Sequence, residues 1–70
     1  MSKIQAIVFS KSKGWGKLKA KHWLKSHNYV PIKKVHDNGT QLRYRLRPPN
    51  FKHYFTKKLQ NGILLIFGYS

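Results

Sequence analysis

The feature that most constrains this chain is its charge. Lysine and arginine supply 15 of its 70 residues, against one acidic side chain, Asp37, which leaves a formal net charge of +14. A small folded domain ordinarily carries both signs of charge and a net charge of about 2–8. Because like charges repel one another, this excess destabilises any compact state. We therefore expect a polyanionic partner: a nucleic acid first, an anionic membrane surface second and an acidic protein surface third.

The length and composition predict one small folded domain, residues 1–70. A chain this short buries only about 60% of its unfolded surface, and the absence of cysteine leaves it without disulfides or a Cys-based zinc site. Hydrophobic residues nevertheless make up 40% of the chain and recur in periodic runs, unlike those of a disordered basic tail. With no signal-peptide pattern and no apolar run of spanning length, we expect an intracellular or particle-packaged protein, not a secreted one.

The apolar pattern predicts an α+β fold, with a single helix packed on a small antiparallel sheet in the order β-α-β-β-β-β. The helix is expected over 17–27, where Ala20, Trp23 and Leu24 form one apolar stripe. Gly16 is its expected N-cap, and Asn28 is expected in the left-handed position after its end. Strands are expected at 4–9, 32–36, 42–47, the second half of 51–59, and 63–67, with hairpin turns at 37–39 and 61–62.

The first and last strands are apolar on both faces, which predicts that they are neighbours inside the sheet. This arrangement would bring the two termini close together.

Three lysines recur every fourth residue on the predicted helix, at Lys17, Lys21 and Lys25. They form a row away from the apolar stripe, and like charges at this spacing destabilise a helix. Lys17 also lies in the first turn, where the helix dipole disfavours a cation. An ordinary solvated face would mix glutamate with lysine, so the row predicts an anion-binding face.

Three arginines alternate with apolar residues in the strand expected at 42–47: Arg43, Arg45 and Arg47. Residues on one face of a strand are about 6.8 Å apart, and one nucleic-acid strand carries one phosphate charge per about 3.4 Å of helix axis. Arginine offers planar, bidentate donors to phosphate. The alternative is the solvated outer face of a half-exposed sheet. Lys33 and Lys34 in the preceding expected strand complete the basic candidates for nucleic-acid binding.

The aromatic residues among the basic ones have two interpretations. Single-strand binders use such side chains to stack on bases, whereas a small domain also needs them for its core and rim, which is the interpretation we favour. Trp15, which projects away from the helix stripe together with His22, is the exception and joins the candidate nucleic-acid-binding residues. The aromatic set is Trp15, Tyr29, Phe51, Tyr54, Phe55 and Tyr69.

Catalysis and metal binding lack the residues that they need. Asp37 is the only carboxylate side chain, so a carboxylate dyad, a two-metal centre or a Ser-His-Asp triad has too few acids. The four histidines include no pair at helical i, i+4 spacing, so no metal site is expected. His27 is interpreted as a capping or packing residue. We therefore expect a non-enzymatic protein without a cofactor.

Three segments follow one another in a recognisable order: 20–29 with the sequence AKHWLKSHNY, 42–47 with LRYRLR, and 56–69, which contains TKKL, NGI and FGY. This order resembles a small domain attached to the head-maturation (prohead) proteases of some tailed phages, and free-standing proteins of large DNA viruses of algae and protists. The chain departs from that pattern at Asn28, where the family has glycine, and at Leu46. The resemblance implies a viral or phage origin, in the host cytoplasm or nucleus or in the virion, and no established activity.

The helix, the Asn38-Gly39 turn and the arginine strand also follow the order of HicA-type toxins, which are small ribonucleases with a fold like the double-stranded-RNA-binding domain. That family carries its catalytic histidine after a Gly-Ser step in this turn, whereas Thr40 and Gln41 follow here. The resemblance implies RNA binding at most, and not cleavage.

The sequence thus predicts a largely sequence-nonspecific nucleic-acid-binding module, with DNA favoured, that contacts mainly phosphates. The alternative is a small structural protein of a capsid or scaffold that docks its basic surface on an acidic protein or on the packaged genome. Membrane binding, which charge alone ranks second, falls to last, because the apolar stripe of the helix is better used by the core. Oligomeric state stays open, as does whether the lysine and arginine rows share one surface. If the helix packs on the Leu42, Tyr44 and Leu46 face, the two rows point to opposite sides of the sheet.

Overall fold

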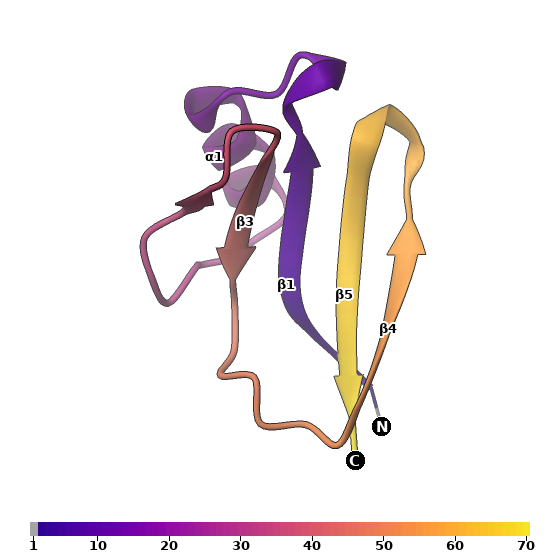
Figure 1. Ribbon diagram of the computed structural model, residues 1–70. Helices are drawn as coiled ribbons and strands as arrows, with labels where there is room; N and C mark the ends of the chain where they lie inside the picture. The colour runs from indigo at the N-terminus through magenta and orange to yellow at the C-terminus, as the bar shows by residue number, and fades with distance from the viewer. Residues whose placement is uncertain (1) are drawn as a thin grey trace.

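In its described residues the protein forms one α-helix, two short 3-10 turns and a five-stranded antiparallel sheet (Figure 1). The computed structural model describes residues 2–70. The predicted α+β fold, with one helix after the first of five strands, is confirmed. In chain order the elements are β1 (Lys3–Ser10), the 3-10 turn η1 (Lys11–Lys13), α1 (Lys17–Ser26), β2 (His36–Asp37), β3 (Gln41–Arg45), β4 (His53–Lys58), the 3-10 turn η2 (Gln60–Gly62) and β5 (Ile63–Tyr69).

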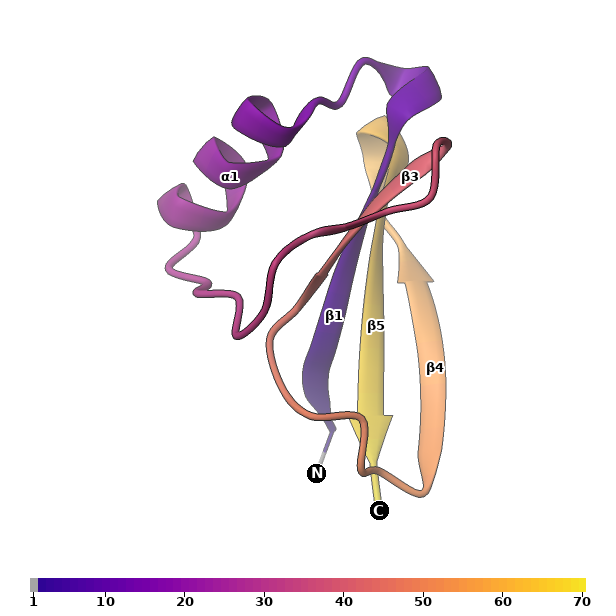
Figure 2. The ribbon, with the colours of Figure 1, turned by 60° about the vertical axis from the view of Figure 1, so that its left-hand side comes forward.

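The strands lie in the order β2-β3-β1-β5-β4, with every pair antiparallel. The two apolar strands, β1 and β5, are neighbours with a further strand on either side, as predicted from their apolar faces. Lys3 lies opposite Gly68, and the two ends of the chain lie close together in Figures 1 and 2. The expected proximity of the termini is therefore confirmed.

The ends of α1 follow from local sequence. Gly16 is the N-cap in an extended conformation, and Asn28 after the helix takes the left-handed region with φ of 61°. The N–H of Tyr29 donates to the Leu24 carbonyl over 2.9 Å, and the N–H of Asn28 donates to the Lys25 carbonyl over 3.1 Å. These two bonds make a Schellman motif, which satisfies carbonyls at the helix end.

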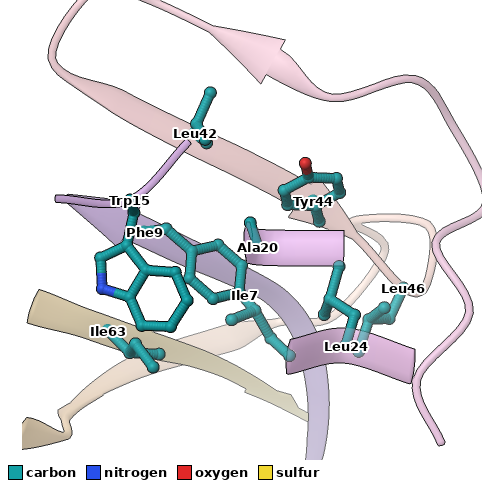
Figure 3. Packing of buried hydrophobic residues seen from close by; sticks show 9 residues of the cluster. All are labelled: Ile7, Phe9, Trp15, Ala20, Leu24, Leu42, Tyr44, Leu46 and Ile63. Atoms are coloured by element: carbon teal, nitrogen blue, oxygen red, sulfur yellow. The ribbon is translucent and has the colours of Figure 1, made fainter. Parts of the chain in front are cut away.

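The core lies between α1 and the β3–β1 half of the sheet (Figure 3). Phe9 is fully buried at its centre, with ring centroids 4.9 Å from Trp15, 5.6 Å from Trp23 and 5.7 Å from Tyr44. Each large apolar side chain removed from water contributes about 1.5–3 kcal/mol. The buried cluster comprises Ile7, Phe9, Trp15, Ala20, Leu24, Leu42, Tyr44, Leu46 and Ile63.

The strand predicted at 32–36 is largely wrong. Only His36 and Asp37 pair, with β3, and residues 28–35 run as an irregular segment from α1 to β2. Pro31 lacks a backbone donor, and the side chain of Ile32 is half exposed. The segment is held instead by the N–H of Ile32, which donates to the Arg45 carbonyl over 2.8 Å.

The strand predicted at 42–47 ends early, at Arg45. Beyond it, the Gln5 carbonyl accepts hydrogen bonds from the N–H groups of both Leu46 and Arg47, over 2.8 and 3.2 Å. The register of β1 with β5 also shifts at this residue, between Ile4 and Ala6. This irregularity bends the chain out of the β-ladder, and the two prolines that follow have no N–H with which to resume it.

Candidate nucleic-acid interface

A basic groove runs between α1 and the 28–35 segment. Its volume is about 830 Å³. Leu24, Val35 and Tyr44 contribute apolar surface to its lining. Five lysines from the two sides also line it, three from the helix and two from the segment: Lys17, Lys21, Lys25, Lys33 and Lys34. The structure therefore brings the predicted helix row and the predicted Lys33-Lys34 pair to one groove.

A smaller hollow of about 360 Å³ adjoins this groove at the β2–β3 edge of the sheet. It is lined by Lys33, Lys34, Val35, His36, Arg43 and Arg45. Lys33 and Lys34 line both depressions. They therefore connect the helix lysines to the strand arginines around the edge of the sheet.

The alternation of β3 decides where its arginines lie. Leu42 and Tyr44 are buried against the helix side of the sheet. Arg43 and Arg45 consequently point to the opposite face, where Arg43 is exposed and Arg45 is half buried. The lysine and arginine rows do lie on opposite faces of the sheet, and the 28–35 segment makes them one continuous basic surface.

Arg47 lies apart from this surface. It follows the end of β3, lines neither depression, and its Nη1 donates to the Ile4 carbonyl over 3.3 Å. The predicted row of three arginines on one strand face is therefore a pair, because β3 ends before Arg47.

The single acidic side chain is already paired. The Nζ of Lys11 lies 2.7 Å from a carboxylate oxygen of Asp37. The hydrogen bond from Lys11 and a second from the Gly39 N–H hold the pKa of this carboxyl below its ordinary value. Because the sequence has no other Asp or Glu, no acidic side chain neutralises the groove lysines.

Tyr44 links the lining of the groove to the helix. Its hydroxyl donates to the Lys17 carbonyl over 3.4 Å. Burial raises the pKa of the Tyr44 phenol above its ordinary value. The hydroxyl is therefore neutral at physiological pH, and the groove presents no ionised side-chain oxygen to an anion.

Trp15 does not belong to this surface. Its side chain is only 8% exposed and packs on Phe9. Its Nε1–H donates a hydrogen bond to the Asn61 carbonyl. The Nζ of Lys19 lies over its ring, 4.8 Å from the centroid. The prediction of Trp15 as a nucleic-acid contact is corrected accordingly: it closes one end of the core. His22 beside it in the prediction is exposed on α1.

His27 has the capping and packing role expected of it. It is the C-cap of α1, its Nδ1 lies 2.8 Å from the Trp23 carbonyl oxygen, and its ring stacks on Trp23 with centroids 4.0 Å apart.

Across residues 2–70 no three histidine, aspartate or glutamate side chains gather as a metal site would require. In the same residues no helix has the length and apolarity to cross a membrane.

The sequence favoured a core or rim role for Phe55 and Tyr69, but it did not reveal that they belong to one cluster of partly exposed aromatic rings on β4 and β5. The members are His53, Phe55, Phe67 and Tyr69, and the register sets Phe55 opposite Phe67 and His53 opposite Tyr69. These pairs follow from the three-residue turn Gln60–Gly62, whereas the two-residue turn expected at Asn61-Gly62 sets Phe55 opposite Gly68 and would not have found them.

Comparisons with known proteins supply no relative: no protein-family model, no curated protein and no solved structure matches this chain.

Proposed function

We propose that the protein is a non-enzymatic nucleic-acid-binding module that holds phosphates in the groove between α1 and the 28–35 segment, with DNA favoured. The observation that carries this proposal is the meeting of five lysines in one groove that continues to Arg43 and Arg45. The arrangement concentrates positive charge where no acidic side chain can neutralise it.

The chemistry of the groove favours phosphate over base contacts. Lysine is a flexible point charge, and it reads no base sequence when it contacts a phosphate. Besides the lysines and arginines, the depressions carry few polar groups: the Asn28 amide and the Tyr29 and Tyr44 hydroxyls in the groove, and the His36 imidazole in the smaller hollow. Binding that is strong at low salt and nearly independent of base sequence follows from this composition.

The test compares two double variants with the same loss of charge. Lys33→Gln/Lys34→Gln removes the pair shared by both depressions, and Lys3→Gln/Lys13→Gln removes two exposed lysines that line neither of those two depressions. Each variant has two charges fewer than the natural chain. Binding to a labelled DNA duplex is measured across a salt series.

Each phosphate contact contributes about −0.9 to the slope of log K against log salt concentration. The Lys33/Lys34 variant should flatten this slope by about 1.8, and the Lys3/Lys13 variant by less than about 0.5. Equal effects of the two variants would show that net charge alone matters and would overturn the assignment of the groove.

A further inference from the structure

The helix leaves part of its own side of the sheet uncovered. A helix with its side chains is about 10–12 Å wide, whereas five strands spaced about 4.8 Å apart span about 19 Å. The buried residues of α1, Ala20 and Leu24, pack with residues of β1 and β3. In Figure 2, β4 lies at the edge of the sheet away from α1. The same face of β4 and of the end of β5 that carries Phe67 and Tyr69 therefore has no second layer, whereas Ile63 at the start of β5 is buried in the core.

Aromatic rings occupy this uncovered area. Phe55 stacks on Phe67 with centroids 4.9 Å apart and ring planes 7° from parallel. His53 stacks on Tyr69 at 5.1 Å and 26°, and the Phe55 and Tyr69 centroids are 5.9 Å apart. Despite these contacts, Phe55 remains 44% exposed and Tyr69 39% exposed. The four rings form a cluster, which we call the aromatic platform.

The geometry leaves one ring face of Phe55 free. Its near-parallel stack with Phe67 covers one face of Phe55. The other face points outward past β4, which is an edge strand with all six residues exposed. An exposed aromatic face beside a strand edge is the geometry on which an unpaired base can stack.

The charge around the platform matches the same ligand. Lys57 is two residues after Phe55 and so lies on the same face of β4. Lys52 directly precedes β4, and Lys58 is the last residue of β4 and points to the face opposite Phe55. Phosphates that follow a stacked base would meet lysine, and the only acidic side chain, Asp37, belongs to β2 at the opposite edge of the sheet.

We propose that Phe55 and Tyr69 form a stacking site for unpaired bases of single-stranded nucleic acid. The inference rests on the proposed function, since it assigns a second contact surface to the same polyanionic ligand. A second copy of this chain is the less favourable occupant, because two molecules of charge +14 repel each other. Lysines on an edge strand also disfavour pairing with another strand.

The test uses two probes of equal length and equal phosphate charge: an oligothymidylate and an oligonucleotide of abasic sites. Stacking requires a base, so the natural protein should bind the oligothymidylate at least about five-fold more tightly. The variant Phe55→Leu/Tyr69→Leu keeps apolar bulk and removes both aromatic faces. It should lose this preference and bind the two probes equally.

Tyr54→Leu is the matched control. Tyr54 is 44% exposed on the same strand, and its side chain points to the opposite face of the sheet. This variant should retain the preference for bases. Duplex binding should change by less than about two-fold in both variants, since a duplex offers no unstacked base.

Three results separate the outcomes. If the natural protein binds neither duplex nor single strand, the proposed function fails. If duplex binding depends on Lys33 and Lys34 but the base preference is absent or survives Phe55→Leu/Tyr69→Leu, only the stacking site is refuted. Sedimentation of the free protein should show a monomer, and a dimer abolished by Phe55→Leu/Tyr69→Leu would instead assign the platform to a second copy.

Discussion

The backbone N–H of Ile32 donates a hydrogen bond to the carbonyl oxygen of Arg45 over 2.8 Å. This one bond ties the irregular 28–35 segment to the end of β3. It thereby places Lys33 and Lys34 between the helix lysines and the strand arginines, so that two rows on opposite faces of the sheet become one basic surface.

Hydrogen exchange can detect this attachment. The Ile32 amide should exchange at least about ten-fold more slowly than the amides of Lys33 and Lys34, because protection reports opening of a bonded amide. In the described part of the chain these two lysine amides donate to no backbone carbonyl. The measurement is residue-resolved exchange by NMR. Similar rates at the three positions would mean that the segment is not fixed to β3.

The left-handed conformation of Asn28 predicts opposite effects of two small substitutions. Its φ of 61° suits glycine and is unfavourable for alanine, whose Cβ approaches the following carbonyl. Asn28→Ala should lower the free energy of unfolding by about 1 kcal/mol, and Asn28→Gly should be neutral or slightly stabilising. Urea denaturation of both variants measures this difference. Equal stabilities would contradict the assigned helix end.

Gly68 is required by close approach. A Cβ at this position would overlap the ring of Phe51. Gly68→Ala should therefore cost about 1–3 kcal/mol of unfolding free energy through overpacking. In a Phe51→Ala background the same substitution should cost clearly less, since its partner is gone. Additive costs in this double-mutant cycle would exclude the Phe51 contact as the cause.

The Lys11–Asp37 pair predicts a pH-dependent contribution to stability. The folded-state pKa of Asp37 is lowered, chiefly by the hydrogen bond from Lys11, from an ordinary value of 3.8. The charged carboxylate therefore stabilises the fold above about pH 4, and this contribution is lost as the pH falls through the lowered pKa.

Asp37→Asn tests this contribution, because the amide oxygen can still accept from the Gly39 N–H. Its Tm should lie below that of the natural protein at pH 6, by a small amount because the pair is exposed. The two Tm values should converge as the pH falls below the lowered pKa of Asp37. A difference that persists at low pH would point to packing rather than charge.

Local sequence was enough to predict α1 and its ends, because Gly16 and Asn28 act on their nearest neighbours. The apolar runs of β1 and β5 likewise predicted that these strands are adjacent and internal. These features depend on short-range geometry and on burial, both of which leave a periodic pattern in the chain.

The features that sequence reasoning missed depend on distant partners. The path of 28–35 follows a bond from Ile32 to Arg45, and Trp15 is held in the core by the Asn61 carbonyl. The exposure of Phe55 follows from the width of the sheet beyond the reach of one helix. None of these relationships leaves a periodic signal in the sequence.

The most direct test of nucleic-acid binding is a salt titration of binding to duplex DNA, single-stranded DNA and RNA, with heparin as a plain polyanion. If about six phosphates are contacted, the slope of log K against log salt should be near −5 for duplex DNA. A module that binds nucleic acid should give that slope together with tighter binding to nucleic acid than to heparin. Equal, weak binding to all four polyanions would contradict it and would direct attention to an acidic protein partner such as a capsid or scaffold component.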